Sequence, residues 1–221
     1  SGNGSDKFEM IRNPDGTGSL KIIKPLDYEE QTRNNPIRFK IQVKDTGKES
    51  PDDPYHMDSA WITVKLRDIN DNAPQIDRVS ESVQVEEDAR VGTILETFRA
   101  KDPDQRGMSK VSFSIDRASD THRQFAISQD GVVTIQRPLD RELTPYHVIR
   151  ILAVDDGLPP KTSTATLSVT VVDVNDNQPV LASDHLYMVV EGEPPRVVAT
   201  LVAVDADNYT AGHGPPFPFK L

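Results

Sequence analysis

Short runs in which apolar and polar residues alternate are the main pattern of this chain. Every second residue from Ile37 to Val43 is apolar, and the same alternation runs from Ile62 to Leu66 and from Leu167 to Val171. A period of two is typical of a strand with one buried face. Gly, Pro and Asp turns separate the runs, and no window shows a convincing helical period. The pattern therefore predicts an all-β chain built from β-sandwiches of roughly seven strands each.

Several motifs occur twice at a similar spacing. DINDNAP at 68–74 returns as DVNDNQP at 173–179, 105 residues later. GSLKIIKPLDYE at 18–29 returns as GVVTIQRPLDRE at 131–142, AKDPD returns as AVDAD, and VEED returns as VVEG. The offsets differ slightly from motif to motif, as expected for loops of different length between fixed elements. The chain therefore contains repeated folded domains.

The two D-x-N-D-N-x-P runs set the predicted domain boundaries. They define one complete repeat at 75–178, with a partial repeat on each side. Residues 1–74 carry the closing strands of a repeat and residues 179–221 the opening strands. An incomplete sandwich exposes sheet edges and part of its core. We therefore expect each partial repeat to be unstable or to be completed by another segment, for example by domain swapping between chains.

Composition narrows the possible functions. The 35 acidic residues outnumber the 25 basic ones, for a net charge of -10. This charge argues against nucleic acid or an anionic membrane as a partner and favours cations. The chain has no Cys, which excludes disulfides, thiolate catalysis and Cys-based zinc sites. It also has no run of 18 apolar residues that would predict a membrane span.

Carboxylates and side-chain amides concentrate near the two predicted boundaries. The first set is Asp27, Glu29, Asp68, Asn70, Asp71, Asn72, Asp102, Asp104 and Asp155. The second set is Glu87, Asp140, Glu142, Asp173, Asn175, Asp176, Asn177, Asp205 and Asp207. Calcium prefers six to eight hard oxygen ligands of this kind on a frame that tolerates irregular geometry. Each set is therefore a candidate calcium site.

Electrostatic repulsion supports the same interpretation. Asp140 and Glu142 stand at positions i and i+2, so on an extended backbone they point to the same face. Two unit charges about 5 Å apart repel by about 3 kcal/mol at an effective dielectric constant of about 20. Such a cluster needs a cation or must disperse, and a divalent ion shared between domains satisfies it.

Three structures other than a shared calcium site could contain these motifs. A single D-x-N-D-N run is most simply a solvated Asx turn, but here two copies each follow a strand and precede Pro. An EF-hand requires Gly and Glu where Ala73 and Val79 stand. Asp140 and Glu142 could be a catalytic acid pair, yet Asp27 and Glu29 duplicate them, and one active site gives no reason for a copy. The five His match no metalloprotease motif and are expected on the surface or in strands.

Taken together and in this order, the D-x-N-D-N-x-P runs, the L-D-x-E motifs, the D-x-D and A-x-D motifs and the opening-strand Glu resemble cadherin repeats. The resemblance implies tandem seven-stranded Greek-key β-sandwiches of immunoglobulin-like topology, no enzymatic activity, and about three calcium ions at each complete junction. It adds the carbonyls of Ile69 and Val174 to the two ligand sets. It assigns Asn175, the Asn177 carbonyl, Asp205 and Asp207 to the third ion of the second junction.

The resemblance also implies a function. We expect a calcium-rigidified segment of a cell-surface, calcium-dependent adhesion receptor, whose partners are other cadherin ectodomains that bind through repeats not necessarily in this chain. The alternative is a cadherin-like module of a signalling or ligand-binding receptor. The parent protein is expected to be a single-pass membrane glycoprotein that displays this segment outside the cell. Asn3 and Asn208 lie in N-glycosylation sequons, and Trp61 is expected to pack in a core or on a strand face.

Overall fold

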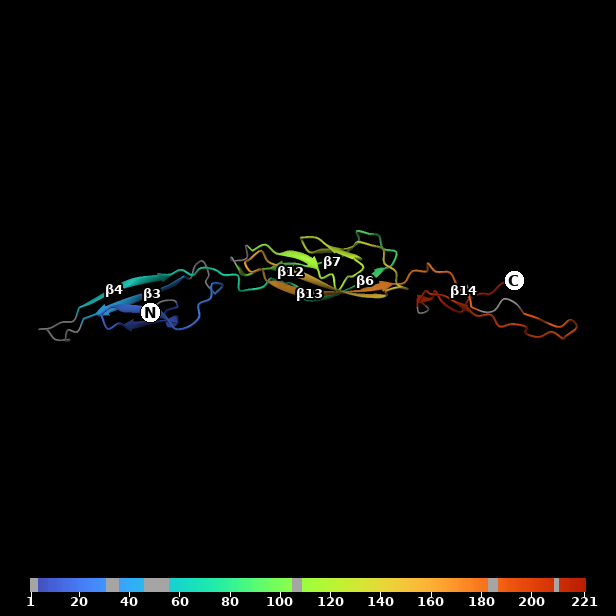
Figure 1. The fold of residues 1–221 in the computed structure, drawn as a ribbon, viewed down its shortest axis with the longest axis horizontal. Coiled ribbons are helices and arrows are strands. Elements are labelled where there is room, and N and C mark those ends of the chain that lie inside the picture. The colour runs from blue at the N-terminus through green and yellow to red at the C-terminus, as the bar shows by residue number, and fades with distance from the viewer. Residues whose placement is uncertain (1–3, 31–35, 46–55, 105–108, 183–186, 209–210) are drawn as a thin grey trace. The chain divides into compact units, whose positions relative to one another are not determined.

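The computed structural model describes residues 4–30, 36–45, 56–104, 109–182, 187–208 and 211–221, which form two compact units (Figure 1). The first unit contains Ser1–Asn72, Asp102–Ser109 and Gly157–Pro159, and the second contains the remaining residues. Among the described residues, no helix has the length and hydrophobicity needed to cross a bilayer. The described elements are strands apart from short 3₁₀ turns such as η1 at Ser5–Lys7, which confirms the all-β prediction.

The first unit contains two antiparallel strand pairs. Its strands are β1 (Phe8–Arg12), β2 (Gly18–Ile22), β3 (Ile37–Lys44) and β4 (Met57–Val64), with β1 paired to β2 and β3 paired to β4. The alternation of β3 places Ile37 and Phe39 in the interior, and the ring of Phe39 packs against that of Phe8 with centroids 5.0 Å apart. This packing joins the two strand pairs.

The second unit contains the complete sandwich. One sheet has the order β6 (Ser80–Glu86), β13 (Thr162–Val172), β12 (Tyr146–Val154) and β9 (Ser112–Ile115). The other has the order β10 (Phe125–Ile127), β11 (Val132–Ile135) and β7 (Ile94–Thr97). Two short pairs complete the described strands, β5 (Gln75–Ile76) with β8 (Ala100–Lys101) and β14 (Val180–Leu181) with β15 (Ala203–Val204). The described part of 75–178 thus has seven strands in its two main sheets, as predicted.

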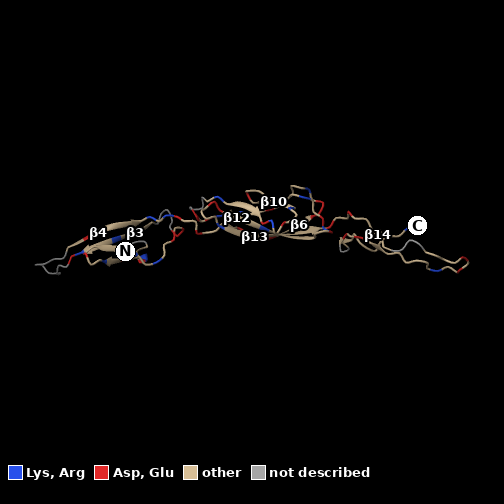
Figure 2. Ribbon diagram, viewed as in Figure 1, with Lys and Arg blue, Asp and Glu red and all other residues tan. Residues whose placement is uncertain are grey.

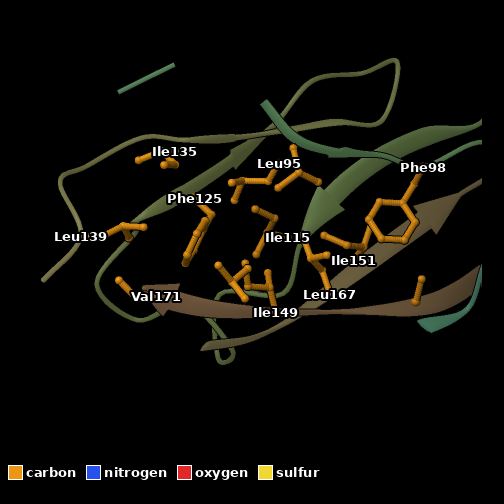
Figure 3. Packing of buried hydrophobic residues seen from close by; sticks show 13 residues of the cluster. Leu95, Phe98, Ile115, Phe125, Ile135, Leu139, Ile149, Ile151, Leu167 and Val171 are labelled. Atoms are coloured by element: carbon orange, nitrogen blue, oxygen red, sulfur yellow. The ribbon is translucent and has the colours of Figure 1, made fainter. Parts of the chain in front are cut away.

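The core of the second unit lies between the two main sheets (Figure 3). Phe98, Phe125, Ile149 and Leu167 are fully buried within it. The period of two explains this arrangement, because alternate residues of β12 and β13 point inward, while the four Thr of β13 and Ser168 point out. No buried core residue belongs to the predicted ligand sets.

Gly131 lets the loop that carries Phe98 pack closely against the backbone at the start of β11. Its φ of +82° is unfavourable for residues with a side chain, and an added β-carbon would lie 2.1 Å from the Phe98 carbonyl oxygen. The Phe98 N–H donates a hydrogen bond of 2.9 Å to the Gly131 carbonyl. The glycine therefore lets this loop seat Phe98 between the sheets.

Three apolar positions differ from the simplest reading of the pattern. Val43 continues the alternation of β3 but is 68% exposed. Val111 continues the alternation of Phe113 and Ile115, but it lies before β9 and outside the buried cluster. Trp61 is 55% exposed on β4, so it packs on the strand face and not in a core. Alternation reports which face a side chain points to, whereas burial also requires a second layer over that face.

Candidate metal centres

Acidic side chains from distant parts of the sequence meet at two places. In the first unit, carboxylate oxygens of Glu29, Asp68 and Asp104 lie within 4.8 Å of one another, and we call these residues the first acidic group. In the second unit, two triplets with the same spacing share Glu142. They form the second acidic group, which consists of Glu87, Asp140, Glu142, Asp173 and Asp207. All eight residues were predicted ligands.

The two groups have the same hydrogen-bonded frame. The Asn72 side-chain amide donates to Asp104 Oδ1 at 2.7 Å and to Asp71 Oδ1 at 2.9 Å. One repeat later, the Asn177 amide donates to Asp207 Oδ1 at 2.8 Å and to Asp176 Oδ1 at 2.9 Å. These bonds use only the NH₂ group of each amide, so the side-chain oxygen and the backbone carbonyl of each Asn remain available as acceptors.

Backbone groups continue this duplication. The Asp104 N–H donates to Asp102 Oδ1 at 2.8 Å, and the Asp207 N–H donates to Asp205 Oδ1 at 3.0 Å. The carbonyls of Ile69 and Val174 each accept an N–H two residues later at 2.9 Å. A carbonyl oxygen has a second lone pair, so both remain able to contact an ion. The linker motif thus folds in the same way in both copies.

Glu87 is held in place by backbone donors. Its Oε1 accepts the Val174 N–H at 2.9 Å and its Oε2 accepts the Arg141 N–H at 2.8 Å. These bonds tie the end of β6 both to the linker after β13 and to the L-D-R-E loop. The side chain is 5% exposed, so its charge is buried with fixed donors on one side and the other acids of the second group nearby.

The backbone at Asp140 and Glu142 is not extended, so the alternation of an extended segment does not apply to them. The residues form a turn and not an extended segment, because the Leu143 N–H donates to Asp140 Oδ1 at 2.8 Å and the Thr144 N–H to the Asp140 carbonyl at 2.9 Å. Asp27 accepts the N–H groups of Glu29 and Glu30 in the same manner. Asp accepts hydrogen bonds from following N–H groups readily, and the turn still brings both carboxylates of each motif to one side.

Burial and mutual repulsion shift the pKa values of the clustered acids. Burial raises the pKa of Glu29 to about 7, with the nearby carboxylates of Asp27 and Asp68 contributing. The pKa of Glu142 is raised by burial and by the charge of Glu87. Asp176 is raised by burial and by Glu87 and Asp207, so its pKa also lies above the usual range. Clustered carboxylates of this kind favour a proton or a metal cation.

Asp173 is the exception in the second group, because cationic and N–H partners surround it. Burial alone would raise its pKa, but the hydrogen bond from His213, the Asn208 N–H and the Arg141 charge together lower it. His213 Nδ1 lies 2.5 Å from Asp173 Oδ2, and Arg141 Nε lies 2.5 Å from Asp173 Oδ1. Arg141 also pairs with Glu142 and donates to the Ala206 carbonyl at 2.8 Å.

Sequence reasoning missed Arg141 and His213. The contrast between L-D-R-E and L-D-Y-E was a signal for Arg141, because only the second copy carries a cation inside the motif. No sequence signal indicated His213, which was expected on the surface or in a strand.

The structure also describes the remaining predicted ligands. Asp155 is buried and accepts the Lys161 N–H at 3.0 Å, and Asn175 is exposed. The Asn70 amide donates to the Pro159 carbonyl at 2.7 Å, and Gly157 packs so closely that an added β-carbon would lie 2.1 Å from Asn70 Cγ. Of the two sequon residues, Asn208 lies in the described part, and its N–H donates to the carboxylate of Asp173. Asn3 lies outside the described residues.

The donor chemistry of both groups fits calcium. The side chains offer carboxylate and amide oxygens and no sulfur, as a hard cation prefers. Glu29 Oε1 is buried without a hydrogen-bond partner among the described residues. A buried carboxylate oxygen in that position is costly unless a cation or proton satisfies it.

The fold and these two groups define a class of protein: tandem β-sandwich repeats with duplicated acidic motifs at the repeat boundaries. The family model for the cadherin domain matches residues 81–172. The chain is 57% identical over 221 residues to Neural-cadherin of Drosophila melanogaster and 52% identical over 223 residues to Putative neural-cadherin 2 of the same organism. Both alignments cover 100% of this chain but only 7% and 12% of those proteins.

A solved structure has the same architecture. Repeats EC22-24 of mouse Cadherin-23 superimpose with a TM-score of 0.72 at 26% identity, covering 90% of this chain and 62% of that one. The chain belongs to the cadherin superfamily. Its repeats are therefore cadherin ectodomain repeats, and proteins of this family are adhesion receptors and not enzymes. Cadherin domains in general bind calcium.

Proposed function

We propose that this chain is a calcium-stiffened segment of a calcium-dependent cell–cell adhesion receptor, displayed on the outer side of the plasma membrane. In this proposal residues 75–178 are a complete repeat, and 1–74 and 179–221 belong to the repeats on either side. The adhesive partners are other cadherin ectodomains, which bind through repeats that need not lie in this chain.

The observation that carries the proposal is the duplicated frame around Asn72 and Asn177. The same contacts between side-chain amides and carboxylates recur in both linkers. A solvated loop has no reason to repeat the same set of amide and carboxylate contacts. A shared ligand requirement at each linker explains the repetition.

We assign the ligands of each junction by motif. The first junction uses Asp27, Glu29, Asp68, Ile69, Asn70, Asp71, Asn72, Asp102, Asp104 and Asp155. The second uses Glu87, Asp140, Glu142, Asp173, Val174, Asn175, Asp176, Asn177, Asp205 and Asp207. About three Ca²⁺ ions per complete junction are what the resemblance to cadherin repeats implies. When bound, calcium supplies the positive charge that offsets the repulsion among these carboxylates.

The chain's own residues convert that charge balance into stiffness. Glu87 ties β6 to the linker, and Asn177 ties the linker to Asp207 beyond it. With the acids neutralised, these hydrogen bonds hold the linker in one conformation. Without neutralisation, repulsion favours separating Asp205 and Asp207 from the acids of the complete repeat, so the second linker becomes a hinge.

The test compares Asp176→Ala with wild type in a longer chain that completes the repeat beginning at residue 179. Asp176→Ala should weaken calcium binding in titration calorimetry and increase protease cleavage near Asn177. Asp130→Ala, an exposed acid in another loop, is the matched control and should change neither. Flexibility of the wild type is followed by X-ray scattering with and without calcium. The proposal is wrong if neither the scattering nor the protease cleavage of the wild type responds to calcium.

The runner-up function is a cadherin-like module of a signalling or ligand-binding receptor. It uses the same fold and ions. An aggregation assay with cells that express the intact parent protein separates the two, since only an adhesion receptor clusters cells in a calcium-dependent manner.

A further inference from the structure

The outer face of the β3–β4 sheet, opposite Phe39, carries an unusual concentration of positive charge. Alternate positions on β3 and along β4 into its continuation supply five basic residues and a tryptophan, all of them exposed. We call this set the basic stripe: Arg38, Lys40, Lys44, Trp61, Lys65 and Arg67. Figure 2 shows Lys and Arg in blue along these strands.

The register of the sheet places the members side by side. Lys40 stands directly opposite Trp61, and Arg38 stands one pair further along, opposite Thr63. The Arg38 guanidinium lies over the Trp61 ring, 4.9 Å from its centroid. This cation–π contact orients the arginine while most of its donors stay accessible.

Acidic side chains are absent from this face over the described strands. The other outer positions are Gln42, Met57, Ser59 and Thr63, all uncharged. The nearby acids Asp45 and Asp58 stand at positions of the opposite face of the sheet. Asp58 pairs with Val43, which is on the same face as Phe39. The positive charges are therefore not interrupted along the stripe.

Four of the five cations have no ion-pair partner among the residues that the structure describes: Arg38, Lys40, Lys65 and Arg67. Like charges on adjacent positions of a sheet face repel. In a chain of net charge -10, acids were available to neutralise them. Their segregation on one face instead favours an anionic partner.

The corresponding sheet face of residues 75–178 carries few basic residues, so the fold does not require the basic stripe. Aligning Asp68 with Asp173 matches β4 to β13, whose outer positions are Thr162, Thr164, Thr166, Ser168, Thr170 and Val172. On β12 the single outer base is Arg150, and it pairs with Asp116. Basic charge on this sheet is a property of the first unit alone.

The chemistry of the stripe matches a linear sulfated polysaccharide. Sulfates keep their charge at neutral pH and recur along an extended polymer, as the cations recur along the strands. Basic clusters of this kind are typical of heparin and nucleic-acid sites. Cadherin domains of membrane proteins face the extracellular space, where sulfated polysaccharides are abundant, and an exposed indole offers an apolar surface to a sugar ring.

We propose that the basic stripe binds linear sulfated polysaccharide, with Arg38, Lys40, Lys44, Lys65 and Arg67 contacting sulfates and Trp61 packing against a sugar ring. The stripe uses residues of β3, β4 and the segment that follows β4, and Arg67 at its end lines the same cavity as Glu29 and Asp68 of the first acidic group.

Trp61 is the single tryptophan of the chain, so its fluorescence reports on this face directly. Heparin-derived oligosaccharide should change Trp61 emission and reduce its quenching by acrylamide, with and without calcium. By analogy with other linear polyanions, the logarithm of the binding constant should fall linearly with the logarithm of the salt concentration. Unchanged emission at saturating oligosaccharide would overturn the proposal.

Two double variants locate the site. Arg38→Ala with Lys40→Ala should weaken binding about tenfold or more at about 0.15 M salt and reduce the salt slope by about two, one for each contact removed. Lys65→Ala with Arg67→Ala should act alike and leaves the contact of Arg38 with Trp61 intact. The matched control, Lys21→Ala with Arg90→Ala, removes one lysine and one arginine elsewhere and should bind as wild type.

Competing ligands complete the test. The same polysaccharide after removal of its sulfates should not bind. An equal loss of affinity in the control variant would show that only net charge matters and would contradict the proposal. Tighter binding to phosphatidylserine vesicles or to single-stranded DNA at the same salt concentration would also contradict it and would point to those surfaces instead.

Discussion

Arg141 and Tyr28 occupy the same position in the two copies of the L-D-x-E motif. Arg141 reaches into the second acidic group, where its guanidinium lies against Asp173 and Glu142. An arginine in this place neutralises part of the repulsion with a charge that belongs to the chain. Arg141 also contacts carboxylates that we assign to calcium, so its guanidinium and a calcium ion compete for the same oxygens.

Replacing Arg141 by Tyr, the residue of the first copy, should therefore raise calcium affinity at the second junction. We expect an increase of about fivefold, which corresponds to about 1 kcal/mol, because the desolvation cost of a largely buried ion pair offsets most of its attraction. Calcium titration by calorimetry measures it. Arg117→Ala, which removes an arginine paired with Asp120 outside both groups, should leave affinity unchanged. A lower affinity in Arg141→Tyr would mean that the arginine supports the ligands.

Glu29 makes the first unit sensitive to pH. In the calcium-free protein its pKa is raised to about 7 from an ordinary value of 4.5, chiefly by burial. Because the folded value lies above the unfolded one, its contribution to stability is fully present below about pH 4.5 and is lost as pH rises through about 7.

Titration of the Glu29 carboxyl by NMR in the presence of a chelator should therefore show a midpoint near 7. Calcium affinity at the first junction should increase over the same pH range, since protons compete for the carboxylate. Glu29→Gln should abolish this pH dependence. A Glu29 midpoint at its ordinary value would contradict the prediction.

Strands β6 and β13 show how an element serves both the fold and the site. They pair in parallel from Ser80 with Thr166 to Glu86 with Val172, so both end at the same edge of the sheet. Glu87 follows one strand and Asp173 the other. The core residues of β13 thus fix the position of the linker, and burial of its apolar face determines where the acids lie.

Gly131 and Gly92 allow a matched test of loop packing in the complete repeat. Both have positive φ, but a β-carbon at Gly92 meets nothing within 4 Å, whereas one at Gly131 would lie 2.1 Å from the Phe98 carbonyl oxygen. Gly92→Ala should cost about 1 kcal/mol from backbone strain. Gly131→Ala should cost roughly 2–4 kcal/mol more, because Phe98 must move from the core. Urea unfolding measures both, and equal losses would show that the clash is relieved easily.

At the scale of the whole molecule, calcium and the hydrophobic core act at different places. The buried cluster of the second unit contains no acidic residue, and the acidic groups lie at the ends of strands. Ion removal should therefore change the linkers while the sandwich of 75–178 stays folded.

The far-UV circular dichroism spectrum of this sandwich should be retained in excess chelator. Its melting temperature should fall, because Glu87, Asp140 and Asp173 belong to it and calcium stabilises the folded state by mass action. For an extracellular site with a dissociation constant of about 10⁻⁴ to 10⁻³ M, about 1 mM calcium contributes about 0.4–1.4 kcal/mol for each ion bound. Loss of the β-sheet spectrum on chelation would mean that the ions are required for folding.

The sequence by itself determined the all-β class, the repeat and the acids that meet. Alternation in the run of Leu167, Val169 and Val171 predicted an inward face, and all three are buried. Duplication of the linker motif predicted that Glu29, Asp68 and Asp104 in one place, and Glu87, Asp140 and Glu142 in another, would come together, as they do. These features follow from local periodicity and from repetition, which the chain records directly.

Only the tertiary structure decided what surrounds those residues. The contact of His213 with Asp173 joins positions 40 residues apart, and no periodicity predicts such a pair. The exposure of Val43 and of Trp61 depends on which layers cover β3 and β4, which a strand pattern does not contain. The turn at Asp140 arises because its carboxylate accepts a following N–H, whereas spacing alone suggested an extended segment. Burial and pairing are set by neighbours distant in sequence, so only the folded chain determines them.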